Sequence, residues 1–126
     1  MARILVVDDD DVFRFAIRLV LEAAGYEVVD AADGAAGLQQ YREQGADLVL
    51  VDVFMPEMDG LQVIRALRIA IPQPKIVAMS GGGRIGFLDV LKAAGAVGAV
   101  RTLRKPFESH ELLAAIREVL RAPPSC

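Results

Sequence analysis

Four consecutive aspartates, residues 8 to 11, follow directly after the apolar run at residues 3–7. Adjacent carboxylates repel one another, so positive charge close by would stabilise such a run. That charge can come from a metal ion, a helix N-terminus or a basic partner, or the run can simply be solvated by water. Carboxylate oxygens suit a hard divalent cation such as Mg²⁺, and they also bind the free N–H groups at a helix start.

Three more side chains that can do chemistry stand at or just after the ends of other short apolar runs. They comprise a carboxylate, a hydroxyl and an amine. Together with a metal ion, such groups can surround an oxyanion while a carboxylate acts as nucleophile, which suits a phosphoryl group. These residues are Asp52, Ser80 and Lys105.

Short apolar runs alternate five times with longer amphipathic stretches, which predicts strands alternating with helices. This order is typical of an α/β fold with a doubly wound, five-stranded parallel sheet. Right-handed crossovers place all carboxyl ends of the strands on one edge, where sites form. The predicted strands are 3–7, 26–31, 47–52, 75–80 and 99–103, and the predicted helices are 11–25, 33–45, 61–71, 84–95 and 108–121.

The position of the first strand divides the four aspartates. Because that strand ends at Val7, Asp8 and Asp9 should lie just beyond its carboxyl end. Asp10 or Asp11 should then cap the following helix, where carboxylates meet free N–H groups and the helix dipole. Ser109 is the predicted N-cap of the last helix.

Composition narrows the class of protein. The 126 residues fit one domain, and 54% apolar residues suffice for a core. A net charge of -3 argues against direct nucleic-acid binding. The single cysteine, Cys126, cannot form an intrachain disulfide, which favours a reducing cytoplasmic location. No apolar stretch is long enough to span a membrane.

The segments "VVDDD", "VDVFMPEMDG", "AMSGG" and "RKPF", in this order, resemble the receiver domain of two-component response regulators. The resemblance extends over about residues 3 to 121. It implies a (βα)5 flavodoxin-like fold with strand order 2-1-3-4-5, in which residues 1–122 form the receiver domain and residues 123–126 a tail or the start of a linker.

The resemblance also implies a phosphoacceptor and a metal site. Asp52 would accept a phosphoryl group from a sensor histidine kinase, a phosphotransfer protein or a small phosphodonor. Asp9 and Asp52, with the backbone carbonyl of Phe54, would bind Mg²⁺ or Mn²⁺ directly, and Asp8 would act mostly through water. The chain would catalyse only its own phosphorylation and dephosphorylation, and so would not be an enzyme acting on other molecules.

Three further roles follow from the resemblance. Lys105 would pair with Asp52 at rest and with a phosphoryl oxygen afterwards. Ser80 would move toward the phosphoryl group as a switch hydroxyl, and Pro106 occupies a position that carries a cis peptide bond. A downstream protein partner, or an output domain missing from this sequence, would read the switched face.

Two positions depart from the family pattern. Thr102 replaces the aromatic residue that often lies three positions before the lysine, so an inward-moving ring cannot report the switch. Phe54 is bulky, and we interpret it as limiting access of the hydrolytic water and so changing the phosphoaspartate lifetime. Phe54 also stands where an aspartyl phosphohydrolase has its second aspartate, which disfavours that function.

An interaction module that works without phosphorylation remains an alternative function. Receivers that dimerise through the face containing the fifth strand commonly carry an acidic pair before that strand. This chain has Arg101 and Arg104 there instead, so a dimer of that kind is not supported.

Several polar residues are interpreted as structural. Asp47 stands at a strand start and Asp59 in a turn with Gly60. His110 has no second ligand nearby and is predicted to be exposed in the first turn of the last helix. Four arginines at helical spacing are predicted to be outer-face charges: Arg14, Arg18, Arg117 and Arg121.

Overall fold

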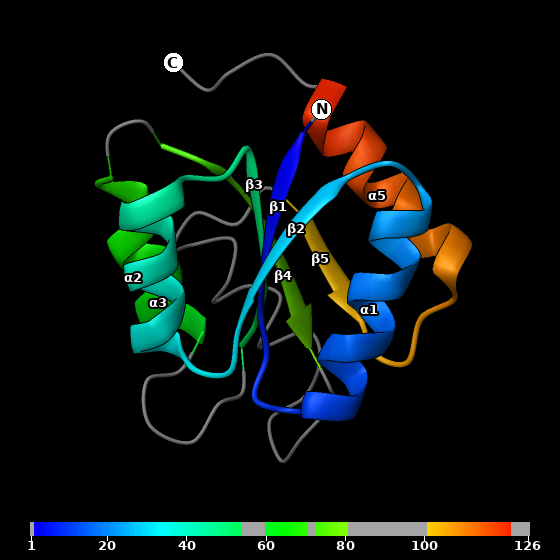
Figure 1. Cartoon of the computed structure of the whole chain (residues 1–126), viewed down its shortest axis with the longest axis horizontal. Helices are drawn as coiled ribbons and strands as arrows, with labels where there is room; N and C mark the ends of the chain where they lie inside the picture. The colour runs from blue at the N-terminus through cyan, green and yellow to red at the C-terminus, as the bar shows by residue number, and fades with distance from the viewer. Residues whose placement is uncertain (1, 54–59, 71–72, 81–100, 122–126) are drawn as a thin grey trace.

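The protein forms a parallel five-stranded sheet covered by helices on both faces (Figure 1). The computed structural model describes residues 2–53, 60–70, 73–80 and 101–121. The strand order is β2-β1-β3-β4-β5 with every pairing parallel, which confirms the predicted fold class and order. The strands are β1 (Arg3–Val7), β2 (Glu27–Ala31), β3 (Leu48–Asp52), β4 (Lys75–Ser80) and β5 (Arg101–Arg104).

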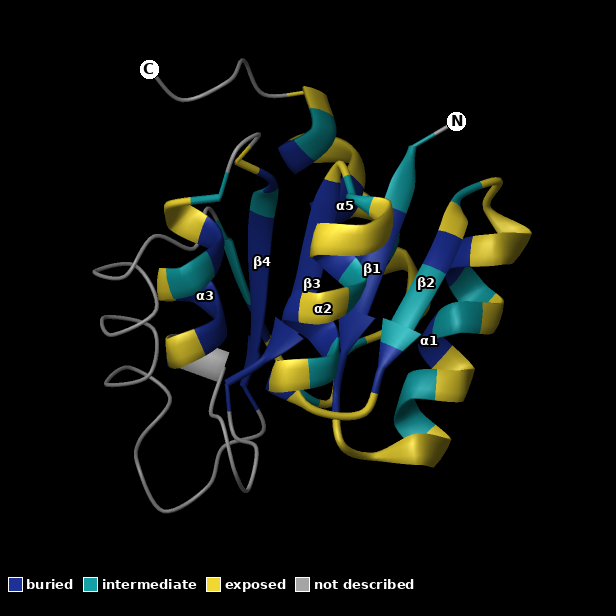
Figure 2. Cartoon of the chain, turned by 60° about the vertical axis from the view of Figure 1, so that its left-hand side comes forward, coloured by how far each residue is buried: buried dark blue, intermediate teal, exposed yellow. Residues whose placement is uncertain are grey.

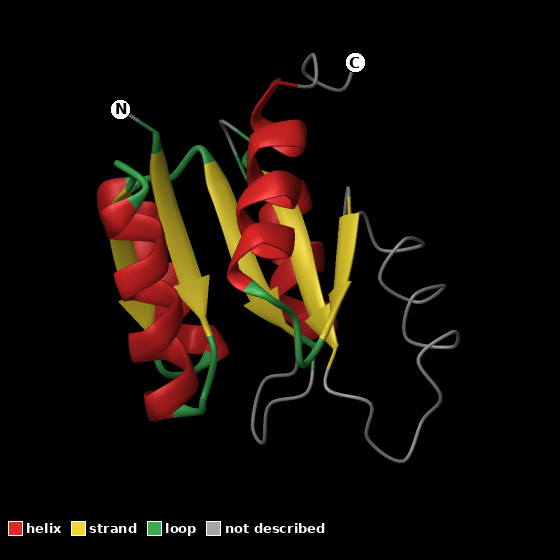
Figure 3. Ribbon diagram, turned by 90° about the vertical axis from the view of Figure 1, so that its right-hand side faces the viewer, coloured by secondary structure: helices red, strands yellow, loops and turns green. Residues whose placement is uncertain are grey.

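The described helices lie in two layers. Helices α1 (Asp11–Ala23) and α5 (Ser109–Arg121) cover one face, which Figure 3 views with the helices in front. Helices α2 (Gly34–Gln44) and α3 (Gly60–Arg68) cover the other. Successive strand residues point to opposite faces, so Ile4 and Val6 join the core under α1 and α5 whereas Leu5 and Val7 join the core under α2 and α3.

The central strands are buried on both faces. All five residues of β3 are buried, and the exposed residues of α2 lie on the side of that helix facing the viewer in Figure 2. A strand covered on both faces needs a continuous apolar run rather than an alternating pattern. The run "LVLV" before Asp52 satisfies this requirement, so the sequence delivers a carboxylate at the point where the buried strand ends.

The helix ends show where sequence signals act. Asp10 is the N-cap of α1, and its side chain accepts a hydrogen bond from the backbone N–H of Phe13 at 3.0 Å. The helix ends two residues before Gly25, whose φ of 95° suits glycine. The predicted N-cap of the last helix was wrong by one residue. Ser109 is already helical, and the N–H of the preceding Glu108 is bound instead by the Glu111 carboxylate at 3.0 Å.

Other predicted boundaries differ by a few residues. Strands β1 and β4 match their predicted ranges, whereas β5 runs one residue beyond its predicted end, to Arg104. Helix α3 ends at Arg68 rather than at residue 71, and the N–H of Ala70 then bonds the carbonyl of Leu67 in a tighter turn. The predicted helix at 84–95 and the loop at 56–60, up to residue 59, lie outside the described residues.

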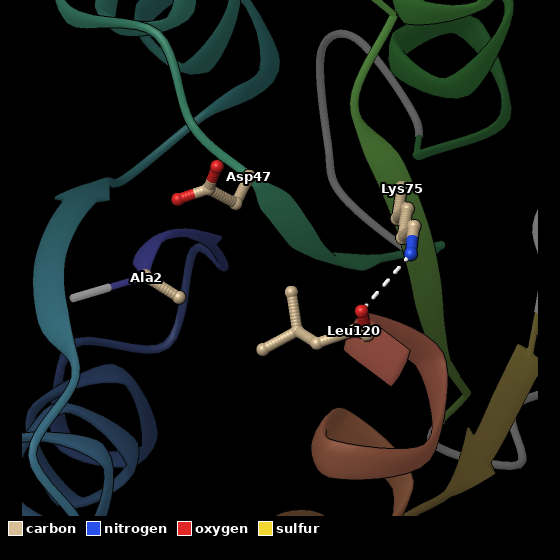
Figure 4. Close-up of a pocket in the computed structure, with 4 residues that line it drawn as sticks. All are labelled: Ala2, Asp47, Lys75 and Leu120. Carbon is tan, nitrogen blue, oxygen red and sulfur yellow. Dashed lines mark hydrogen bonds between the residues drawn. The ribbon is translucent and has the colours of Figure 1, made fainter. Parts of the chain in front are cut away.

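The amino-terminal edge of the sheet carries charges with structural roles (Figure 4). A cavity of about 400 Å³ there is lined by Ala2, Asp47, Lys75 and Leu120. The Lys75 ammonium donates to the Leu120 carbonyl at 3.1 Å, near the negative end of α5. The Asp47 carboxylate accepts from the Arg3 backbone N–H at 2.7 Å. These contacts agree with the structural role predicted for Asp47.

Candidate functional site

Three carboxylates meet at the carboxyl edge of the sheet. Asp8 follows β1 and Asp52 ends β3, and these two strands are neighbours. One ligand oxygen from each of Asp8, Asp9 and Asp52 lies within 4.8 Å of the others. Asp8 is 0% exposed and Asp52 6% exposed, whereas Asp9 faces solvent. The sheet topology therefore gathers the predicted acidic cluster.

The backbone separates the two halves of the aspartate run. Asp8 continues β1 by one hydrogen bond, from its N–H to the carbonyl of Ala31 at 3.2 Å. Its carboxylate then accepts from the N–H of Asp10 at 2.9 Å, which closes the turn into α1. Asp10 itself caps the helix. The prediction that Asp8 and Asp9 lie just beyond the carboxyl end of the strand while Asp10 or Asp11 caps the helix is confirmed.

Lys105 brings a positive charge to the cluster. Its ammonium lies 2.7 Å from a carboxylate oxygen of Asp8 and 3.5 Å from one of Asp52. The predicted pairing with Asp52 is therefore present, but the shorter contact is with Asp8. The backbone N–H of Lys105 donates to the Ser80 carbonyl at 2.7 Å, which extends the β4–β5 pairing and fixes the lysine at the edge of the site.

The charges of the site do not balance among these four residues. Three carboxylates and one ammonium leave two formal negative charges uncompensated. A divalent cation would bring the sum to zero, and a donor set made only of oxygen suits Mg²⁺ or Mn²⁺. The residues therefore fit the implied metal. Phe54, whose backbone carbonyl was predicted as a further ligand, lies outside the described residues.

Ser80 stands next to the cluster with an unused hydroxyl. It is 0% exposed, and its Oγ has no hydrogen-bond partner in the part of the chain that the structure describes. A buried hydroxyl without a partner is costly and calls for an explanation. Thr102, half-buried on β5, pairs in register with Ala78, two residues before Ser80. The peptide bond between Lys105 and Pro106 is cis, as the resemblance implied.

Arg14 was predicted to be an outer-face charge, and this was wrong. Its side chain is only 16% exposed, and its guanidinium binds three oxygens. These are the backbone carbonyl of Asp8 at 2.7 Å, the carboxylate of Asp30 at 3.1 Å and that of Asp11 at 2.6 Å. Burial lowers the pKa of Arg14, but hydrogen bonds and charges from Asp11 and Asp30 outweigh it and raise that pKa overall.

Helical spacing alone could not reveal the role of Arg14, because its partners lie on other elements. Asp30, near the carboxyl end of β2, was the available signal, since β2 neighbours β1. By holding the carbonyl of Asp8, Arg14 fixes the backbone from which the acidic pair projects. On α5, by contrast, Arg117, Arg121 and His110 are exposed, as predicted.

Two aromatic rings that the sequence did not single out complete the surroundings of Lys105. The ammonium lies 4.1 Å from the centre of the Phe13 ring. Phe107 contacts Phe13 edge to face, with ring centres 5.7 Å apart and an angle of 79° between the planes. The start of α1 thus places the N-cap Asp10, the Arg14 guanidinium and the Phe13 ring at the same edge of the sheet.

Fold and site together define a class of protein. A doubly wound parallel sheet carries a buried carboxylate beside two others, an ammonium, and a hydroxyl with no partner among the described residues, all at the edge where such sheets bind ligands. This set of groups is suited to receiving a phosphoryl group on a carboxylate. Among the described residues, no helix is long and apolar enough to cross a membrane.

Comparison with known proteins identifies the family. The model of the response regulator receiver domain matches residues 4–117, and the chain belongs to this family. It is 36% identical over 120 residues to the chemotaxis protein CheY of Bacillus subtilis, covering 94% of this chain and 97% of that protein. A transcriptional regulatory protein, CseB of Streptomyces coelicolor, is 38% identical over 118 residues, or 94% of this chain.

Solved structures agree with the fold. A CheY-like receiver domain protein from Methanospirillum hungatei superposes with a TM-score of 0.87 at 30% identity, covering 95% of this chain and 94% of that one. A response regulator from Chloroflexus aurantiacus gives a TM-score of 0.88 at 33% identity, covering 96% and 98%. The chain spans nearly all of the Bacillus subtilis CheY but only 49% of CseB.

Substitution of Asp10 and of Asp9 should have different effects. Asp10→Ala removes the cap of α1 and should lower the free energy of unfolding by about 1 kcal/mol, while changing the Kd for Mg²⁺ by less than about twofold. Asp9→Ala removes a carboxylate from the cluster and should weaken Mg²⁺ binding at least about tenfold. Urea unfolding in EDTA and calorimetric Mg²⁺ titration measure the two effects. Equal losses of Mg²⁺ affinity would contradict the division of the aspartate run.

Removal of the ammonium should strengthen metal binding. Lys105→Met takes away the positive charge nearest to Asp8, so Mg²⁺ should bind about three- to tenfold more tightly by calorimetry. Lys75→Met is the matched control, because it removes the same charge at the opposite edge of the sheet and should leave the Kd nearly unchanged. Weaker Mg²⁺ binding by Lys105→Met than by the unmodified protein would mean that Lys105 does not compete with the cation.

Proposed function

We propose that the protein is a phosphorylation-dependent switch in which Asp52 accepts the phosphoryl group. The observation that carries this proposal is the position of Asp52, a 6% exposed carboxylate held beside two other carboxylates and 3.5 Å from the Lys105 ammonium. A carboxylate kept at the ligand-binding edge of an α/β sheet, with a cation beside it, is suited to phosphoryl chemistry.

The proposed reaction is a single displacement at phosphorus. A carboxylate oxygen of Asp52 forms a bond to phosphorus as the bond between phosphorus and the donor's imidazole nitrogen breaks. With a small acyl phosphate the bond that breaks is to the acyl oxygen, and in both cases the leaving group takes the electron pair. Bound Mg²⁺, or Mn²⁺, would supply neutralisation of the charge on the phosphoryl oxygens.

The residues around Asp52 would then reorganise. A phosphoaspartate brings nearly two negative charges and three acceptor oxygens into the site. Lys105 would exchange its contact with Asp8 for a phosphoryl oxygen, and Ser80 would donate its unpartnered hydroxyl to another. Lys105 would give up a contact that it makes in the resting protein, and Ser80 would gain one that it lacks among the described residues. This local event would bias the neighbouring β5 and α5. Thr102 would transmit this bias without a moving ring.

The donor that we propose is a sensor histidine kinase or a phosphotransfer protein. Such a donor must cover the edge of the sheet to bring its phosphohistidine to Asp52. Three large apolar side chains on the outer side of α1 begin one turn from the acidic pair and support contact with a protein: Val12, Phe15 and Leu19, which are 80%, 62% and 52% exposed. A downstream protein, or an output domain in the same polypeptide, would read the switch.

The remaining parts of the proposal concern organisation. Residues 1–122 would act as one receiver domain in the cytoplasm, with 123–126 as a tail or the start of a linker. Hydrolysis of the phosphoaspartate would restore Asp52, so the chain would catalyse only its own modification. Phe54, two residues after Asp52, would limit the entry of the hydrolytic water and set the lifetime of the phosphorylated state.

Incubation with acetyl phosphate and Mg²⁺, followed by intact mass spectrometry, tests the function. We expect one phosphoryl adduct on the unmodified protein. The adduct should be absent without Mg²⁺ and absent in Asp52→Asn, which keeps the size of the side chain but removes the attacking charge. Asp47→Asn, at the opposite edge, is the matched control and should be phosphorylated normally. An adduct that persists in Asp52→Asn, or no adduct at all, would favour an interaction module that works without phosphorylation.

A further inference from the structure

The Lys105 ammonium is enclosed by groups of two different kinds. On one side are the carboxylates of Asp8 at 2.7 Å and Asp52 at 3.5 Å. On another side is the face of the Phe13 ring, with the nitrogen 4.1 Å from the ring centre. That distance is well within the range of about 6 Å over which an aromatic face attracts a cation. The lysine side chain is 17% exposed, so little of it is left to water.

A ring and a carboxylate hold an ammonium in different ways. An ammonium has three N–H donors, and a third carboxylate here would have bound it tightly while adding another negative charge to an acidic site. The ring attracts the cation through its quadrupole and adds no formal charge. It also makes no directional hydrogen bond, so the ammonium can turn from one oxygen to another without leaving the ring.

We propose that Phe13 is a positioning residue for phosphorylation, holding the Lys105 ammonium beside Asp52 so that it can pass from Asp8 to the incoming phosphoryl group. This inference rests on the proposed function, because it assigns a role within the same site. Phe13 also packs against the core under α1 and α5, and the positioning role is additional because the ring faces a charge. No pattern in the sequence pointed to Phe13, which has the helical spacing of an ordinary core residue of α1.

The neighbouring ring supports this assignment. The rings of Phe107 and Phe13 meet edge to face, with centres 5.7 Å apart. That geometry is favourable for two aromatic rings. Phe107, which lies two residues after Lys105 in the chain, therefore helps to hold the Phe13 ring in place. Both the lysine and the ring that buttresses Phe13 therefore come from one short segment, residues 105–107, so the ring and the ammonium keep their relative position.

A double-mutant cycle tests the role of Phe13 through the rate of phosphorylation by acetyl phosphate at saturating Mg²⁺. Phe13→Leu keeps an apolar side chain but removes the ring, and it should slow phosphorylation about three- to tenfold. Phe13→Tyr keeps the ring and should retain the normal rate. In a Lys105→Met background, Phe13→Leu should have no further effect, because the ring then has no cation to hold.

Phe15→Leu is the matched control for the loss of a phenyl ring from α1. Phe15 is 62% exposed, so this variant should be phosphorylated at the normal rate by acetyl phosphate. An unchanged rate in Phe13→Leu would overturn the inference. Equal slowing by Phe13→Leu in the presence and absence of Lys105 would also overturn it, because the effect would then be structural.

A second measurement does not depend on phosphorylation. Protons next to the Lys105 ammonium should show an upfield ring-current shift in NMR spectra. This shift should disappear in Phe13→Leu and persist in Phe13→Tyr and Phe15→Leu. A shift unchanged by Phe13→Leu would show that the ring does not hold the ammonium. If the ring-current result is as expected but no variant, including the unmodified protein, is phosphorylated, the proposed function fails and the role of Phe13 in it fails too.

Discussion

The site depends on offsetting the repulsion between carboxylates that the sheet places close together. Asp8 and Asp52 are both buried, with oxygens within 4.8 Å of each other. At an effective dielectric constant of about 20, two such charges repel by about 3 kcal/mol. This is a large share of the roughly 5–15 kcal/mol that stabilises a domain. Lys105 brings one positive charge to these carboxylates, and a divalent cation would bring two more.

The surrounding elements hold this arrangement in place. Helix α1 contributes most, because its N-cap Asp10 fixes the turn after β1, Arg14 holds the carbonyl of Asp8, and Phe13 faces the Lys105 ammonium. The β4–β5 pairing delivers Lys105 through the hydrogen bond from its N–H to Ser80. The ammonium, the carboxylates and the hydroxyl are therefore each tied to a strand end, and under the proposed function the side-chain contacts of Lys105 and Ser80 would be the first to change.

The sequence predicts the fold well because buried parallel strands require continuous apolar runs, and these runs show where strands end. Knowing the ends of β1 and β3 was enough to place Asp8 and Asp52 on one edge. The roles of Arg14 and Phe13 could not be predicted in this way. Both have ordinary helical spacing, and their partners, Asp30 and Lys105, lie far along the chain. The closer approach of Lys105 to Asp8 than to Asp52 likewise depends on side-chain geometry that no spacing rule contains.

Among the four described residues of the site, three carboxylates and one ammonium leave two formal negative charges, which a divalent cation would balance. The free energy of unfolding measured by urea at increasing Mg²⁺ concentration, at constant ionic strength, tests this claim most directly. If Mg²⁺ binds only the folded site, stability should rise with the logarithm of its concentration above the Kd. In the same titration of Asp9→Ala, the rise should begin only at Mg²⁺ concentrations at least about tenfold higher. A stability that does not depend on Mg²⁺ in the unmodified protein would contradict the claim.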